Sequence, residues 1–114
     1  MSACLFCHIV DRTIQSTIVY EDEQTLAFHD IHPQAPVHLL VIPKRHVQSV
    51  QDLETTDAVL VGHLLRVCVK LAQEKGISES GYRIVTNSGP HAGQTVLHLH
   101  FHLLGGRSMT WPPG

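Results

Sequence analysis

Apolar and polar residues alternate strictly near the end of this chain, between positions 97 and 104. The polar positions are all histidines, and the positions between and beside them are large and apolar: His98, His100 and His102, with Leu97, Leu99, Phe101 and Leu103. A β-strand sends alternate side chains to opposite faces, so the pattern predicts a strand over 98–104 with three imidazoles on one face. In a helix the same three positions would not converge.

Other apolar runs predict four more strands, at 17–20, 25–30, 37–42 and 81–87. Pro33 and Pro36 separate the second strand from the third, because proline cannot continue a sheet ladder. Strands that are neighbours in sequence favour antiparallel pairing. Residues 1–114 are therefore expected to form a single α+β domain with an antiparallel sheet of about five strands.

The spacing of apolar residues becomes helical between positions 52 and 75. One stripe follows the pattern i, i+4, i+7, i+8: Leu60, Leu64, Val67, Cys68, Leu71 and Ala72. Thr55 or Thr56 is expected to cap the start of this long helix, and Gly76 to end it. Further apolar positions, including Val59 and Leu65, widen the stripe and suggest that a second subunit covers part of the helix. A short helix is expected near the N-terminus.

Composition excludes several classes of function. The 114 residues carry a net charge of −2, so no basic surface predicts a nucleic acid polymer as partner. No apolar run reaches the roughly 20 residues that cross a membrane. Three cysteines are an odd number for a secreted disulfide framework, and the N-terminus lacks the pattern of a signal peptide. These features predict a cytoplasmic protein.

Two chemistries suit three imidazoles on one face. They can hold a metal ion, or a neutral imidazole can attack phosphorus and form a covalent intermediate. A metal-dependent hydrolase usually needs a nearby carboxylate, but the last forty residues contain only Glu79. Backbone N–H groups and a hydroxyl from Gly93, Gln94 and Thr95 would instead suit a phosphate. The nucleophile is therefore favoured.

Cys4 and Cys7 form a C-x-x-C pair, which is compatible with half a zinc site or with two unrelated thiols. His38 is a single histidine in an apolar run, and local sequence alone favours core packing for it.

The histidine segment resembles the H-x-H-x-H-x-x signature of the histidine triad superfamily. Further similar blocks cover residues 4–7, 27–31, 33–38, 41–46, 93–95 and 105–107. The ending Trp111-Pro112-Pro113-Gly114 resembles the Hint branch of that superfamily. The resemblance implies a homodimeric hydrolase of purine nucleoside phosphoramidates, such as adenosine 5′-monophosphoramidate and aminoacyl or lysyl adenylates.

The resemblance also assigns roles to residues. His100 would be the nucleophile, His102 would contact the α-phosphate, and His98 and His38 would complete the active-site histidines. The purine and ribose would contact a largely apolar group with one acid, which holds the ribose hydroxyls: Asp30, Phe28, Ile31, Phe6, Ile9 and Ile14. The phosphate side would be Asn87, Gly93, Gln94 and Thr95. Trp111 would reach the active site of a partner subunit.

A subset of relatives binds structural zinc at positions that correspond to Cys4, Cys7, His46 and His98. The resemblance thus implies a structural zinc ion and no cofactor for catalysis itself. Two alternatives stay open: a nucleotide-binding scaffold with incidental turnover, and a zinc-dependent phosphohydrolase in which the triad binds the metal.

Overall fold

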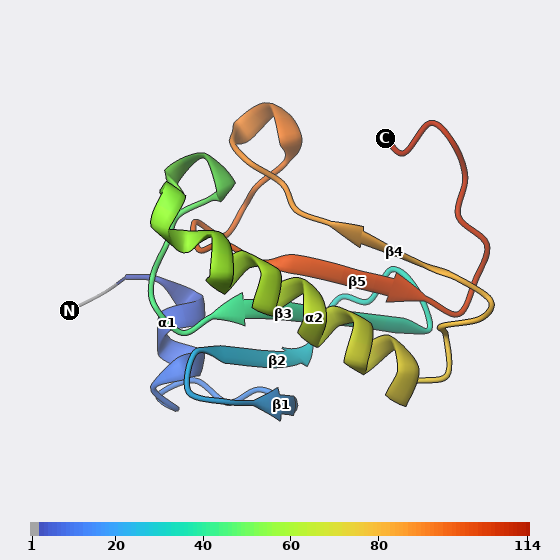
Figure 1. Ribbon diagram of the computed structural model, residues 1–114, viewed down its shortest axis with the longest axis horizontal. Helices are drawn as coiled ribbons and strands as arrows, with labels where there is room; N and C mark the ends of the chain where they lie inside the picture. Colours follow the sequence, from blue (N-terminus) through green and yellow to red (C-terminus); the bar gives the residue numbers. More distant parts are fainter. Residues whose placement is uncertain (1–2) are drawn as a thin grey trace.

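Five antiparallel strands form one sheet in the computed structural model, which describes residues 3–114 (Figure 1). Their bounds are β1 (Ile18–Glu21), β2 (Thr25–His29), β3 (Val37–Pro43), β4 (Tyr82–Val85) and β5 (Phe101–Gly105). The spatial order is β1-β2-β3-β5-β4, so the last strand inserts between β3 and β4. The helices are α1 (Leu5–Val10) and α2 (Ala58–Glu74), with short 3₁₀ turns η1 (Val50–Asp52), η2 (Thr55–Asp57) and η3 (Pro90–Ala92). The expected α+β class is confirmed.

The long helix α2 lies diagonally across one face of the sheet (Figure 1). Alternate strand residues meet it there: Ala27, Leu39, Val41, Phe101 and Leu103 pack with Leu64, Val67, Cys68 and Leu71 of the helix. The residues between them point to the opposite face, where a second cluster gathers Leu26, Phe28, Leu40 and Ile42 around Phe6 and Ile9 of α1. The two-residue period of the strands thus builds both layers of the core.

The start of α2 differs from the expectation, while its end agrees with it. Thr55 and Thr56 lie in η2 and do not cap the helix. Asp57 occupies the N-cap position of α2 without a side-chain cap bond to it, and its carboxylate accepts the backbone N–H of Glu54 at 2.8 Å within η2. Gly76 follows the last turn with φ +72°, and the N–H of Ile77 reaches the carbonyl of Ala72 at 3.0 Å. Glycine adopts this left-handed conformation without steric cost, which ends the helix.

The histidine strand is shorter than its alternating pattern predicts. Pairing of β5 with β3 begins at Phe101, so His98 and His100 precede the strand. The backbone N–H of Leu99 donates a hydrogen bond at 2.6 Å to the carbonyl of Val47, which lies in the connection between β3 and α2. Leu97, the first apolar position of the alternating pattern, is 52% exposed. The prediction of one uninterrupted strand over 98–104 is therefore wrong. The alternation of faces nevertheless holds, because Leu99, Phe101 and Leu103 pack on the α2 side, whereas the rings of His98 and His100 both contact Phe6 on the opposite side.

Within residues 3–114, no helix is long and apolar enough to cross a membrane.

Candidate functional site

A cavity of about 290 Å³ opens on the face of the sheet that α2 leaves uncovered, between α1 and the strands. Nine of the predicted site residues line it: Phe6, Ile9, Ile14, Phe28, Asp30, Ile31, Thr95, His100 and His102. Its inner wall is apolar and aromatic, and the Phe6 and Phe28 rings meet edge to face with centroids 5.3 Å apart. Its imidazoles and its carboxylate come from the strand ends. Such a cavity suits a flat aromatic group joined to a polar one.

His100 is held with one ring nitrogen occupied and the other available. Its Nδ1–H donates to the backbone carbonyl of His98 at 2.7 Å. The side chain is only 7% exposed, and burial lowers its pKa below the usual value of 6.5. A neutral imidazole protonated on Nδ1 carries its lone pair on Nε2. His100 therefore has the state that nucleophilic attack requires.

A chain of hydrogen bonds sets the tautomers of two other histidines. The backbone N–H of Gln34 donates to Nδ1 of His38 at 3.0 Å, so neutral His38 carries its proton on Nε2. That atom lies 2.9 Å from Nδ1 of His102 and donates to it. Neutral His102 then carries its proton on its own Nε2. His102 is thereby prepared as a hydrogen-bond donor toward an anion in the cavity.

The charge state of this pair is also set by burial. Burial is the largest effect that lowers the pKa of His102 to about 4, and the imidazoles of His100 and His38 lower it further. The pKa of His38 is lowered by burial as well, and Asp30 opposes this in part. Both histidines are neutral at pH 7, so they act through N–H groups and lone pairs.

Asp30 directs its carboxylate toward both the cavity and this pair. Oδ2 lies 3.4 Å from Nε2 of His38, and Oδ1 accepts the backbone N–H of His32 at 2.8 Å. The second contact holds the side chain against the turn that follows β2. The lone pairs left over on the carboxylate can accept hydrogen bonds from a pair of hydroxyl groups.

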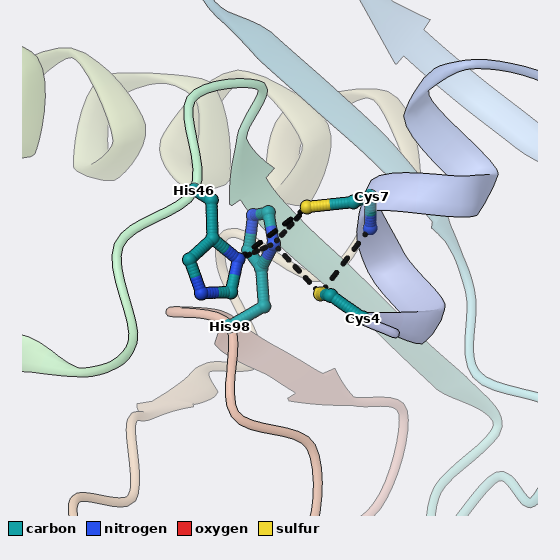
Figure 2. Close-up of side chains that lie close together, drawn as sticks. All are labelled: Cys4, Cys7, His46 and His98. Carbon is teal, nitrogen blue, oxygen red and sulfur yellow. Dashed lines mark hydrogen bonds between the residues drawn. The ribbon is translucent and has the colours of Figure 1, made fainter. Parts of the chain in front are cut away.

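Four sulfur and nitrogen atoms converge beside the cavity, from three separate segments (Figure 2). Nδ1 of His98 lies 3.3 Å from Sγ of Cys4, 3.5 Å from Sγ of Cys7 and 3.3 Å from Nδ1 of His46. Sγ of Cys7 lies 3.4 Å from Nδ1 of His46. All four potential ligand atoms lie within 4.8 Å of one another. We call Cys4, Cys7, His46 and His98 the four-donor cluster.

The distances in the four-donor cluster fit a tetrahedral zinc ion. Bonds of about 2.3 Å to sulfur and 2.0–2.1 Å to nitrogen put two nitrogens about 3.3 Å apart, and sulfur and nitrogen about 3.5 Å apart. Nε2–H of His98 donates to the carbonyl of Pro43 at 2.8 Å, which leaves the lone pair of Nδ1 directed toward the other donors. Such outer contacts commonly orient metal-binding histidines. The cluster could hold zinc as a closed set of four ligands.

Apart from the four-donor cluster, five predicted residues do not line the cavity themselves. Of the phosphate-side set these are Asn87, Gly93 and Gln94, and the others are His38, which acts behind His102, and Trp111. The side chain of Gln94 braces its own loop, where its amide donates to the carbonyl of Gln48 at 2.7 Å and accepts from Gly89 at 3.0 Å.

Trp111 is 80% exposed, and the guanidinium of Arg83 on β4 lies 6.0 Å from its ring. It therefore stays outside the cavity of its own chain.

Several residues at the site carry no signal in the sequence. Gln34 contacts His38 through its backbone N–H, and Pro43 contacts His98 through its carbonyl. Thr86 donates from Oγ1 to the carbonyl of His100 at 2.8 Å, which fixes the backbone of that histidine. Gln15 and Ser16, in the loop after α1, line the mouth of the cavity. Backbone contacts and loop positions of this kind depend on the fold and leave no motif.

Comparison with known proteins gives one consistent family. Residues 11–109 match the model of the HIT domain. An uncharacterised HIT-like protein of Synechococcus elongatus is 52% identical over 110 residues, which are 96% of each chain. The crystal structure of a HIT family hydrolase from Legionella pneumophila is 53% identical, with a TM-score of 0.96 over 97% of this chain and 99% of that one. A HIT family hydrolase from Clostridium thermocellum is 47% identical, with a TM-score of 0.93 over 96% of both chains.

Proposed function

Because this chain belongs to the HIT domain family, we propose that it hydrolyses purine nucleoside 5′-phosphoramidates through a nucleotidyl-histidine intermediate. The cavity supports a nucleotide, since its apolar wall of Phe6 and Phe28 suits a base and Asp30 suits ribose hydroxyls. Thr95, His100 and His102 lie on the polar side, where the phosphate would bind. The single observation that carries the proposal is the 2.7 Å hydrogen bond from Nδ1–H of His100 to the carbonyl of His98.

In the first step Nε2 of His100 attacks the α-phosphorus. A P–N bond forms, the bond to the leaving nitrogen breaks, and that nitrogen departs with the bonding pair and one proton from solvent. The adduct carries a positive imidazole ring, and the carbonyl of His98 stabilises this charge by accepting Nδ1–H. The N–H of His102 donates to a phosphate oxygen. These contacts strengthen as charge develops, which lowers the barrier.

In the second step water attacks the same phosphorus from the side that the amine has left. The bond to Nε2 of His100 breaks, nucleoside monophosphate leaves, and water returns one proton to solvent. The two steps sum to hydrolysis, with His100 regenerated. No further ion is needed to balance them.

The decisive experiment looks for the intermediate. Protein mixed with adenosine 5′-monophosphoramidate and quenched early is expected to gain the mass of one adenylyl group on the peptide that contains His100. His100→Asn is expected to lose hydrolysis by about 10³-fold or more and to keep its affinity for AMP. Full activity of the variant would show that His100 is not the nucleophile. A protein that binds AMP tightly but never forms the adduct would instead be a nucleotide-binding scaffold.

We also propose that the four-donor cluster holds a structural zinc ion. Two thiolates and two imidazoles complete a tetrahedron and leave no position for water or substrate, which distinguishes it from a catalytic zinc site. Elemental analysis of freshly purified protein is expected to find about one zinc per chain. Zinc-free protein of full stability would reject the site. The cluster requires reduced Cys4 and Cys7, which fits the reducing cytoplasm that the sequence predicts.

A homodimer is the third part of the proposal. Val59 on α2 is 83% exposed and Leu65 is 39% exposed, so the outer side of the helix presents apolar surface. Trp111 is exposed beside β4 and lies outside its own cavity, where it could reach a partner. Analytical ultracentrifugation is expected to give twice the mass of one chain, and a charge at position 59 (Val59→Glu) to give the single mass.

A further inference from the structure

His98 belongs to two sites at once. Its side chain supplies Nδ1 to the four-donor cluster, and its backbone carbonyl accepts Nδ1–H of His100. We propose that the four-donor cluster is a positioning site for catalysis, which sets both the orientation of His100 and the place of the apolar wall that Phe6 forms. The inference rests on the proposed function of His100, and it assigns to His98 the role of a positioning residue.

The backbone that leads into β5 carries the carbonyl of His98. His98 and His100 lie outside the ladder that pairs β5 with β3 and β4, because that pairing begins at Phe101 with β3 and at His102 with β4. The side chain of His98 is wholly buried, with Nε2 fixed by Pro43 and Nδ1 directed into the cluster. The direction of its carbonyl, and hence of Nε2 on His100, therefore depends on how firmly that side chain is anchored.

The short helix α1 begins beside Cys4 and contains Cys7, so both cysteines of the cluster lie at its N-terminal end. The helix spans only six residues, Leu5–Val10, and a helix of that length is not stable by itself in water. Phe6 lies between the two cysteines, and its ring contacts His100 edge to face with centroids 5.1 Å apart. Cys4 and Cys7 thus anchor the helix whose buried side chain packs on the nucleophile.

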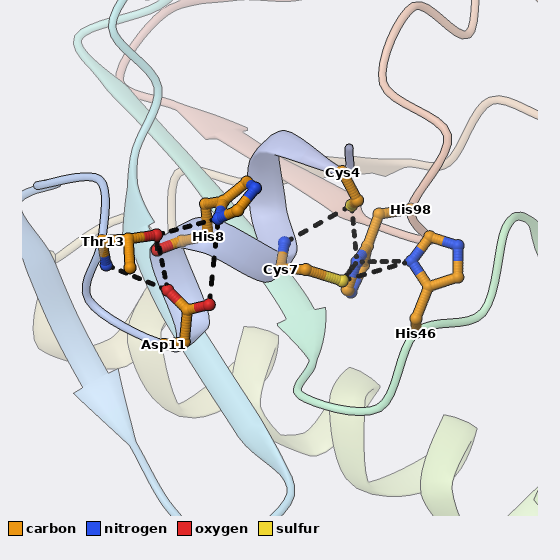
Figure 3. A network of polar contacts seen from close by, with 7 residues as sticks. All are labelled: Cys4, Cys7, His8, Asp11, Thr13, His46 and His98. Atoms are coloured by element: carbon orange, nitrogen blue, oxygen red, sulfur yellow. Dashed lines mark hydrogen bonds and ion pairs between the residues drawn. The ribbon is translucent and has the colours of Figure 1, made fainter. Parts of the chain in front are cut away.

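The C-terminal end of α1 is held by polar contacts between residues that are close in sequence (Figure 3). Nδ1 of His8 lies 2.8 Å from Oγ1 of Thr13, and Oδ1 of Asp11 accepts the backbone N–H of Thr13 at 2.9 Å. These contacts shape the turn after the helix and reach neither His46 nor His98. Figure 3 shows that the polar link from α1 to the other two segments runs through the four-donor cluster.

When bound, zinc would hold the four donors at fixed distances and angles. Through these ligands the ion would link three segments. His46 would hold the connection after β3, the two cysteines would hold α1, and His98 would hold the residues that precede β5. Loss of the zinc ion would therefore change two measurable quantities, the affinity for nucleotide and the rate of attack by His100. A loose α1 weakens nucleotide binding through Phe6, and a loose His98 carbonyl slows attack by His100.

The test uses His46, which is exposed and does not line the nucleotide cavity. His46→Ala removes one ligand, whereas His46→Cys replaces it with another ligand that suits zinc. Cys68→Ala is the matched control, because Cys68 is a buried thiol that packs in the core on α2. Each protein is measured for zinc content, AMP affinity by calorimetry, single-turnover rate with adenosine 5′-monophosphoramidate, and the ¹⁵N signals of the histidines by NMR.

His46→Ala is expected to lose zinc, to bind AMP more weakly, and to form the adduct about 10- to 100-fold more slowly. Its His100 signal is expected to lose the pattern of a single Nδ1–H tautomer. His46→Cys and Cys68→Ala are expected to keep all four properties. Circular dichroism confirms that each variant is folded, and excess zinc added to His46→Ala is expected to restore the signal and the rate together.

The inference is overturned if zinc-free His46→Ala keeps the wild-type AMP affinity, rate and His100 signal. It is equally overturned if wild-type protein binds no zinc yet shows the single tautomer. Failure of the proposed function looks different: loaded wild-type protein would then show the His100 signal and AMP binding that depend on zinc, but would never form the adduct.

Discussion

Nε2 of His38 lies 2.9 Å from Nδ1 of His102, and both rings are neutral at pH 7 because burial lowers their pKa values. The two residues are 64 positions apart in the chain and meet because β3 and β5 pair side by side. The proton on a buried residue of β3 thus decides which nitrogen of His102 can donate into the cavity. His38 is a positioning residue in this arrangement.

Replacing His38 tests this relay. His38→Ala removes the donor that fixes His102, so we expect kcat to fall about 10- to 100-fold, as for other residues that orient a catalytic group. The affinity for AMP should change much less. Steady-state kinetics with adenosine 5′-monophosphoramidate measures both effects. His91→Ala, an exposed histidine on η3, is the control and should behave as wild type. An unchanged kcat in His38→Ala would refute the relay.

Stability should depend on pH through the same pair. The unfolded chain binds protons to these histidines near pH 6.5, whereas folded His102 does so only near pH 4. Between these values the unfolded state holds more protons, so the free energy of unfolding falls as pH falls. A shift of one pKa unit corresponds to about 1.4 kcal/mol in the free energy of unfolding. Solvent screening makes the effect smaller for His102, because this side chain is partly exposed. Stability from this source is complete above about pH 6.5.

Thermal denaturation from pH 7 to pH 5 checks the sign. Tm of the wild-type protein is expected to fall over this range, and His102→Asn should show a smaller fall because one of the contributing groups is absent. His91→Asn should keep the full fall. A Tm that rises on acidification would contradict the assignment of neutral, buried imidazoles.

Asp30 is expected to contribute to recognition of the ribose. Asp30→Asn keeps the size of the side chain but removes its charge, and a hydrogen bond to a charged group is worth about 1.5–3 kcal/mol. KM for adenosine 5′-monophosphoramidate should therefore rise about 10- to 100-fold. The 2′-deoxy substrate should lose less, so comparison of the two substrates is the measurement. Equal losses for both would show that Asp30 acts elsewhere.

Two glycines give a matched test of packing. A Cβ added to Gly105, at the end of β5, would lie 2.5 Å from Cδ1 of Ile77, whereas one added to Gly62 on α2 meets nothing within 4 Å. Gly105→Ala should destabilise the protein by about 1–3 kcal/mol through overpacking. Measured in the Val59→Glu background, where the chain is expected to be single, Gly62→Ala should stabilise it by up to about 1 kcal/mol through helix propensity. Urea denaturation measures both, and equal signs would contradict the packing described here.

Much of the fold could be predicted because its signals are local. The stripe of Leu64, Val67 and Leu71 required a helix, and the left-handed residue after it required a glycine at position 76. The start of the histidine strand is less predictable. The N–H of Leu99 pairs with Val47 in a distant connection, and no local pattern reports that contact. The alternation at 98–100 therefore predicted a strand where the ladder has not yet begun.

The sequence by itself determined which imidazoles, thiols and carboxylate are available to this protein. It also determined the spacing of apolar residues that favours its helices and strands. The alternating pattern by itself makes the three histidines equivalent, and the tertiary structure separates them into two sites. His98 turns into the four-donor cluster, while His100 and His102 line the cavity. The physical reason is that hydrogen bonds to Pro43, Gln34 and the His98 carbonyl fix each ring, and these partners are backbone groups brought close by folding. Backbone groups are the same in every residue, so a sequence cannot mark which of them will meet a histidine.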